Sequence, residues 1–339
     1  MAGRIPLISP NRREFLTTAA ATTAGLALAG PAALAAADAK SPKEPESLVK
    51  VLYESLSEKQ KKEVAFDWDH EDLFRGKLRT HVENNWHITE PTIAGDYFTK
   101  DQQQLIREIF VGIINPEWVE RFDQQLKDDA GGFGKAQNIA IFGRPGEGKF
   151  EMVVTGRHMT MRCDGNSAEH VAFGGPIFYG HAVQGREKAD HPGNVFWHQA
   201  KAANKVYHIL DGKQQTTALV SRSPVEQAVE FHGDQGQFDG ISIADLSSDQ
   251  KEAVQEVLRV LLDPYRQSDR EEVVACLNKT GGLDACHLAF YEDSDVGNDN
   301  IWDNWRLEGP SFVWYFRGKP HVHCWVNVAD SPDVPLNVA

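Results

Sequence analysis

The chain has 339 residues, of which 41% are hydrophobic and 25% are charged, and its formal net charge is -14. This is the composition of a globular protein with enough length for one large domain or two small ones. The acidic balance argues against nucleic acid or an anionic membrane surface as a partner, because both attract basic surfaces. After the N-terminal segment no stretch is long and apolar enough to cross a bilayer, so we expect no stable membrane insertion.

Residues 1–39 have the features of a twin-arginine signal peptide. Residues 11–16 read Asn-Arg-Arg-Glu-Phe-Leu, residues 17–29 are Ala-rich and weakly apolar, and cleavage after Ala35 or after Ala39 fits the A-x-A rule. An anchored transmembrane helix is the alternative, but the apolar run is shorter than the ~20 residues that a span needs. We therefore expect the twin-arginine export machinery as a partner, and a mature protein that is periplasmic or secreted.

Apolar residues at helical spacing, together with cap residues, predict the helices of the mature chain. These lie at 46–62, after Thr99, from 115 to a glycine-rich break at 131–134, at 194–210, after Ser247 or Ser248, and at 269–279. Within the first of them, Ser57 is placed to open a new helical turn.

β-branched and aromatic runs between turn residues predict the strands. These lie at 138–143, 150–163, 170–174 and 288–291, and the second is expected to be one long strand with Gly156 at a bulge. A terminal hairpin follows, with strands at 311–316 and 321–328 and a turn at 317–320 in which Gly318 is free to take a positive φ.

The elements together predict an α+β fold, in which an antiparallel sheet has helices packed before it and inserted within it. Residues 40–339 are expected to form a single domain. In an oxidising compartment disulfides are allowed, and a bridge between Cys276 and Cys286 is expected because turn residues separate them. Closing so short a loop would stabilise the fold by about 3 kcal/mol.

Three histidines are candidate metal ligands. His321 and His323 share one face of the return strand, because successive strand residues point to opposite faces. If His158 joins them, the result is a three-imidazole site with open coordination positions, which suits zinc or copper and also iron. The alternative is that the three are unrelated polar residues on strands, since the sequence does not bring residue 158 to residue 321.

Nearby charged residues would complete such a site. Glu308 would act as a general base or hydrogen-bond a ligand, and Arg306 and Arg157 would bind an anionic group or stabilise developing negative charge.

Four segments resemble the pattern of a protein family. Residues 141–145 resemble its I-F-G-x-P segment, and residues 156–162 resemble G-H-H-L-S-L-N. Residues 305–312 resemble Y-R-I-Q-G-P-T-F, and residues 320–325 resemble the start of N-H-I-H-T-V-W-R. Over about residues 101–328 the chain is thus similar to the domain of unknown function DUF 3500, whose members are mostly secreted bacterial proteins.

The chain departs from that pattern at Arg157, where the family has the first of two histidines, and at Glu308, where it has glutamine. The resemblance retains His158, His321 and His323, and so implies that the three belong to one site. It implies no particular activity.

We therefore expect a secreted metal-binding protein that acts on a small molecule. The leading hypothesis is a metalloenzyme, hydrolytic or oxidative. The competing hypotheses are a non-catalytic periplasmic protein that binds a metal or small ligand, and a metal-free sheet with an unrelated pocket.

Overall fold

The computed structural model describes residues 44–182, 193–293, 295, 299 and 301–336. The predicted signal peptide lies outside these residues. In the described part of the chain no helix combines the length and the apolarity needed to cross a membrane.

A large sheet of eleven strands forms the centre of the fold. In spatial order these are β1 (Ala65–Phe66), β4 (Gln137–Gly143), β5 (Phe150–Gly156), β6 (Met159–Cys163), β7 (Ile177–His181), β13 (Val322–Val328), β12 (Phe312–Arg317), β11 (Asn304–Gly309), β10 (His287–Tyr291) and β8 (Leu219–Val220), with β9 (Ile241–Ser242) also paired to β10. The pairs are antiparallel except β1 with β4 and β8 with β10. β2 (Glu71–Asp72) and β3 (Gly76–Lys77) form a separate hairpin.

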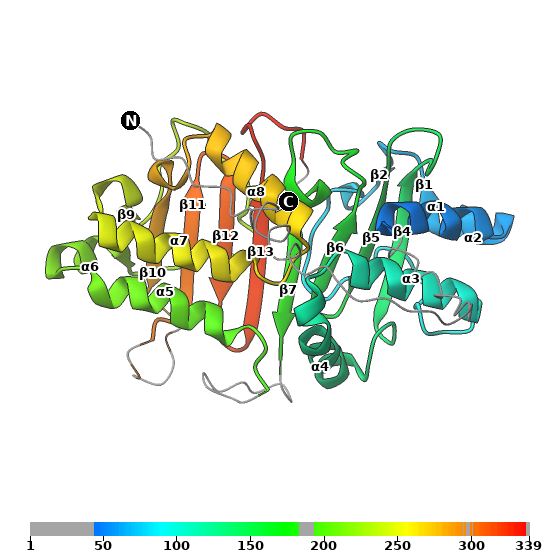
Figure 1. Cartoon of the computed structure of the whole chain (residues 1–339), viewed down its shortest axis with the longest axis horizontal. Coiled ribbons are helices and arrows are strands. Elements are labelled where there is room, and N and C mark those ends of the chain that lie inside the picture. Colours follow the sequence, from blue (N-terminus) through cyan, green and yellow to red (C-terminus); the bar gives the residue numbers. More distant parts are fainter. Residues whose placement is uncertain (1–43, 183–192, 294, 296–298, 300, 337–339) are drawn as a thin grey trace, which may run out of the picture.

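The helices lie together on one face of the sheet (Figure 1). They are α1 (Pro45–Ser55), α2 (Glu58–Val64), α3 (Lys100–Gly112), α4 (Val119–Ala130), α5 (Trp197–Ile209), α6 (Gly212–Ala218), α7 (Ser248–Leu262) and α8 (Gln267–Lys279). The α+β class is confirmed, with helices before the sheet and inserted between its strands. Only the short α6 was not predicted.

Local capping explains where several helices begin. Ser57, Thr99 and Ser247 each accept a hydrogen bond from the backbone of the third helical residue, whose glutamine side chain bonds back to the cap. At the other end of α4, Gly131 takes a left-handed conformation with φ of 76°. The sequence signals for these boundaries were therefore correct.

The two faces of the sheet are covered differently. Under the helices lies the main apolar core, which includes Trp305, Trp314 and Phe316. The opposite face carries smaller clusters around Trp325 and Val153, and segments without long helices or strands cover them. That second face also carries the polar residues discussed below.

Two predictions about the central strands were wrong. Residues 150–163 do not form one strand but the β5–β6 hairpin, because Gly156 (φ 147°) and His158 (φ 53°) reverse the chain between them. The predicted strand at 170–174 is a single bridge at Val171 followed by a short 3-10 helix, and the strand itself comes later, as β7.

The predicted disulfide was also wrong. All four cysteines lie in the described part of the chain, and each is a buried free thiol. Cys276 belongs to the last turns of α8, whereas Cys286 packs into the core just before β10 and donates to the carbonyl of Gly282.

The terminal hairpin is present as β12 and β13, but Gly318 is not among the residues with positive φ. Glycine is needed there for space, because a Cβ atom would lie 2.6 Å from the ring of Trp197.

Candidate metal centre

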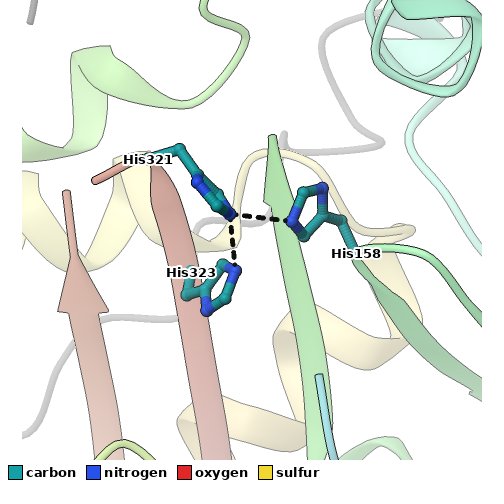
Figure 2. A group of neighbouring side chains, drawn as sticks. All are labelled: His158, His321 and His323. Carbon is teal, nitrogen blue, oxygen red and sulfur yellow. Dashed lines mark hydrogen bonds between the residues drawn. The ribbon is translucent and has the colours of Figure 1, made fainter. Parts of the chain in front are cut away.

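The imidazoles of His158, His321 and His323 meet in the middle of the sheet, where β6 and β13 begin and β7 ends (Figure 2). The Nε2 atom of His321 lies 3.0 Å from Nε2 of His158 and 2.9 Å from Nε2 of His323. Of the three residues, His158 is 1% exposed and His323 is 4% exposed. The structure thus brings together the three residues that the sequence named as candidate ligands.

The β5–β6 turn places His158 in the cluster. A positive φ is uncommon for a residue other than glycine, and a neighbouring contact holds it here: the backbone N–H of His158 donates to the Asn85 side chain at 3.1 Å. Its carbonyl accepts from the N–H of Gly180 at 3.2 Å. The turn therefore directs an imidazole toward β13 across the end of β7.

Gly180 leaves room for the rings. It is paired with His323 in the β7–β13 register. A Cβ atom there would lie 3.3 Å from Cδ2 of His158 and 3.4 Å from Cδ2 of His323. The absence of a side chain at this position thus lets both imidazoles lie over the strand.

Two carboxylates orient the outer histidines. Asp129, near the end of α4, lies 2.7 Å from Nδ1 of His158 and also accepts from the N–H of Ala182 at 2.9 Å. Glu226 lies 2.8 Å from Nδ1 of His323. Because carboxylates accept hydrogen bonds, both Nδ1 atoms donate, and in neutral imidazoles this leaves the Nε2 lone pairs directed at the cluster.

The carboxylates are ionised and two of the histidines are neutral near pH 7. Burial raises the pKa of Asp129, but hydrogen bonds from His158 and His181 outweigh it and hold that pKa well below its usual range. Burial likewise acts on Glu226, and the hydrogen bond from His323 keeps its pKa low.

Burial, reinforced by the neighbouring His323 and His158, lowers the pKa of His321 to about 3. For His323 burial lowers the pKa to about 4, despite the contact with Glu226. Both imidazoles are thus in the form that binds a metal ion.

The three nitrogens lie close enough for one cation to bind all of them after a small adjustment. A proton on Nε2 of His321 is donated to one neighbour only, so neutral rings leave at least one close pair of nitrogens with no hydrogen bond between them. An ion held at about 2.0–2.1 Å by tetrahedrally arranged nitrogens would space them about 3.3 Å apart. The observed 2.9 and 3.0 Å spacings need an outward shift of a few tenths of an ångström.

Arg306 and Glu308 lie elsewhere on the same face of the sheet. They bind each other at 2.7 Å on β11, and Glu308 also lies 3.5 Å from Nε2 of His232. The strand register places Glu308 level with Asn327. Asn327 is four residues from His323 in β13, a distance of about 13 Å along the strand. Arg306 is level with Trp325, two residues from His323 but two strands away, and its side chain binds Glu308. Among the described residues neither member of this pair is therefore in contact with the imidazoles.

Arg157 is the other residue of the β5–β6 turn. Its backbone N–H donates to the carbonyl of Ala136, and its side-chain Nε is buried without a partner among the described residues. Arg157 is thus next to a residue of the cluster. Its predicted role in binding an anion stays a prediction.

Sequence reasoning missed both carboxylates. Asp129 could have been singled out, because an acidic residue in the last turn of a helix interacts unfavourably with the helix dipole. Such a residue needs a stabilising contact elsewhere in the fold. Glu226 lies in a segment without helix or strand and gave no such signal. Arg317, whose Nη1 lies 2.8 Å from Glu226, was placed in the predicted turn at 317–320, whereas the structure pairs it with His323 at the end of β12.

Comparison with known proteins identifies a family but no activity. A family model described as "Protein of unknown function (DUF3500)" matches residues 38–328, which extends the predicted resemblance toward the N-terminus. No curated protein and no solved structure matches the chain.

Proposed function

The chain belongs to the DUF3500 family of proteins of unknown function, and we propose that it is a metalloprotein whose His158, His321 and His323 hold one divalent transition-metal ion. The observation that supports this most directly is the convergence of three Nε2 atoms within 4.8 Å of one another. The carboxylates on the outer nitrogens add to it, because metal-binding histidines are typically oriented in this way. Nitrogen ligands favour zinc or copper, with iron as a further choice.

The proposed role is that of an enzyme, hydrolytic or oxidative, acting on a small molecule. Three protein ligands leave a coordination position for water or substrate. Neutral imidazoles do not compensate the charge of the ion, which therefore makes a coordinated water more acidic or polarises a substrate oxygen.

The test is elemental analysis of the mature protein beside a His321→Ala/His323→Ala variant. Near-stoichiometric zinc, copper or iron is expected in the unmutated protein and is expected to be lost in the variant. His208→Ala is the control, because His208 is exposed on α5 and away from the sheet. Absence of metal in the unmutated protein, with no uptake on reconstitution, would overturn the proposal.

A second candidate is a non-catalytic protein that binds a metal or small ligand. It is favoured by one observation: among the described residues, both carboxylates at the cluster are engaged by ligand imidazoles, and neither is left as a general base. Cobalt substitution separates the two candidates. An enzyme is expected to show a visible spectrum that changes with pH as coordinated water ionises, whereas a closed site is expected to show no such change.

For localisation we propose export by the twin-arginine route to the periplasm or medium. The motif at residues 11–16 supports this. Replacing Arg12 and Arg13 by lysine is expected to leave the protein in the cytoplasm with its signal uncleaved. Unchanged export in cell fractionation would contradict it.

A further inference from the structure

Arg317 lies beside the three-histidine cluster, and two of its three guanidinium nitrogens have no hydrogen-bond partner in the described part of the chain. It is the cross-strand neighbour of His323 in the β12–β13 register. Its Nη1 atom binds Oε1 of Glu226 at 2.8 Å, and the other oxygen of that carboxylate holds His323. Its Nε and Nη2 atoms are buried and have no hydrogen-bond partner among the described residues.

The two free nitrogens belong to one edge of the guanidinium. Nη1 lies on the side of Cδ, so Nε and Nη2 present their N–H groups side by side in the same direction. This edge is the fork that binds both oxygens of a carboxylate. Leaving buried donors of a charged group unpaired is destabilising, and an oxygen ligand would remove this cost.

Arg162 shows how a structural arginine on the same sheet differs. Its side chain is fully buried, and all of its nitrogens are bonded. Nε donates to Pro176 at 2.7 Å, Nη2 donates to His81 at 3.0 Å, and Nη1 binds both Glu151 and the carbonyl of Arg79. By contrast, the Arg317 side chain is 14% exposed, so its guanidinium lies just beneath the surface.

Charge around the cluster favours an anion as well. The carboxylates of Asp129 and Glu226 bring two negative charges, and Arg317 brings one positive charge. With a divalent ion and neutral imidazoles the sum is one positive charge. A monoanion would therefore neutralise the groups in contact with one another.

We infer that Arg317 is a recognition residue for a carboxylate group of the small molecule that reaches the metal ion. This inference rests on the proposed metal function and adds the class of ligand to it. The carboxylate accepts hydrogen bonds from the Nε and Nη2 edge while Glu226 keeps Nη1 in place. Arg306 does not share this role, because its Nη2 is occupied by Glu308.

The test uses the mature protein loaded with Co²⁺ and sodium acetate as the probe, at constant ionic strength. Acetate binding is followed in the visible spectrum. We expect saturable binding to the unmutated protein, about 10–100-fold weaker binding to Arg317→Gln, and an intermediate loss in Arg317→Lys, which keeps the charge but not the fork. Arg259→Gln is the matched control, because Arg259 is exposed on α7, and this variant is expected to bind acetate normally.

The outcomes separate this inference from the proposal on which it rests. Failure of the unmutated protein to take up Co²⁺ would overturn the metal site and this inference with it. Two results would overturn only the role of Arg317. One is normal Co²⁺ uptake with no acetate response, and the other is an acetate affinity in both Arg317 variants that equals that of the unmutated protein. Should Arg317→Gln not fold, the folded Arg317→Lys variant decides in the same way.

Discussion

Asp129 and Glu226 each accept a hydrogen bond from the outer nitrogen of one histidine in the cluster. Such contacts set the orientation and basicity of a ligand imidazole. They also account for two ionised carboxylates in poorly exposed places, where an isolated charge would be costly. At the scale of single residues, the cluster is therefore a built arrangement of five side chains and not three adjacent histidines.

Asp129→Asn is expected to weaken metal binding about 10–100-fold while the fold is kept. The amide has the shape of the carboxylate and still accepts one hydrogen bond, but it removes the charge that holds the Nδ1 proton of His158. Competition with a chelator of known affinity measures the effect. Asp123→Asn is the control, because Asp123 lies on the same helix and pairs with Arg107 at 2.8 Å. Equal affinity in the two variants would contradict the assigned role of Asp129.

At the scale of elements, two hairpins and the pairing of β7 with β13 bring the histidines together. His158 is in the turn of one hairpin, and His321 and His323 begin the return strand of the other. β7 lies between them and pairs with both β6 and β13. The cluster thus depends on the close approach of backbone and rings at Gly180.

Gly180→Ala is expected to lower metal affinity by at least about tenfold. The added methyl group would overlap the carbonyl oxygen of Val322 and crowd the rings of His158 and His323, so the strands must separate or the rings must turn. Calorimetric titration with Zn²⁺ measures the loss. Gly148→Ala is the control, since a Cβ atom at Gly148 meets nothing within 4 Å and its φ is not positive. An unchanged titration for Gly180→Ala would show that the rings do not need this space.

At the scale of the whole molecule, buried carboxylates make stability depend on pH. Burial, together with the charge of Asp164, raises the pKa of Glu272 from 4.5 to about 7. Burial also raises the pKa of Asp269 to about 6, against the attraction of Arg266. In both cases the folded protein binds a proton more tightly than the unfolded chain, so the contribution to stability is full below the unfolded pKa and is lost as pH rises through the folded pKa.

Glu272→Gln is expected to remove part of this loss. Glutamine still accepts the hydrogen bond from the N–H of Phe173, which Glu272 accepts at 3.0 Å, but it does not ionise. Denaturant unfolding should show that the variant loses less stability than the unmutated protein between about pH 4.5 and 7, by on the order of 2 kcal/mol. Glu271→Gln, at an exposed position of the same helix, is expected to follow the unmutated protein. Parallel curves for all three proteins would contradict the prediction.

The sequence by itself determined the local parts of the fold. Caps and apolar periodicity located helices such as those after Thr99 and Ser247, because these signals act within a few residues. Strand alternation likewise placed His321 and His323 on one face, and His158, a candidate third ligand, is retained in the family resemblance. The match to residues 38–328 agrees with that resemblance.

Only the tertiary structure decided how these parts meet. The turn at His158, the free thiols of Cys276 and Cys286, and the partners Asp129 and Glu226 all depend on contacts between distant segments. His158 and His321 are 163 positions apart, and their contact follows from the pairing of β7 with β13. Spacing along a chain constrains a strand or a helix turn, but the position of one strand against another is set by the packing of the whole sheet.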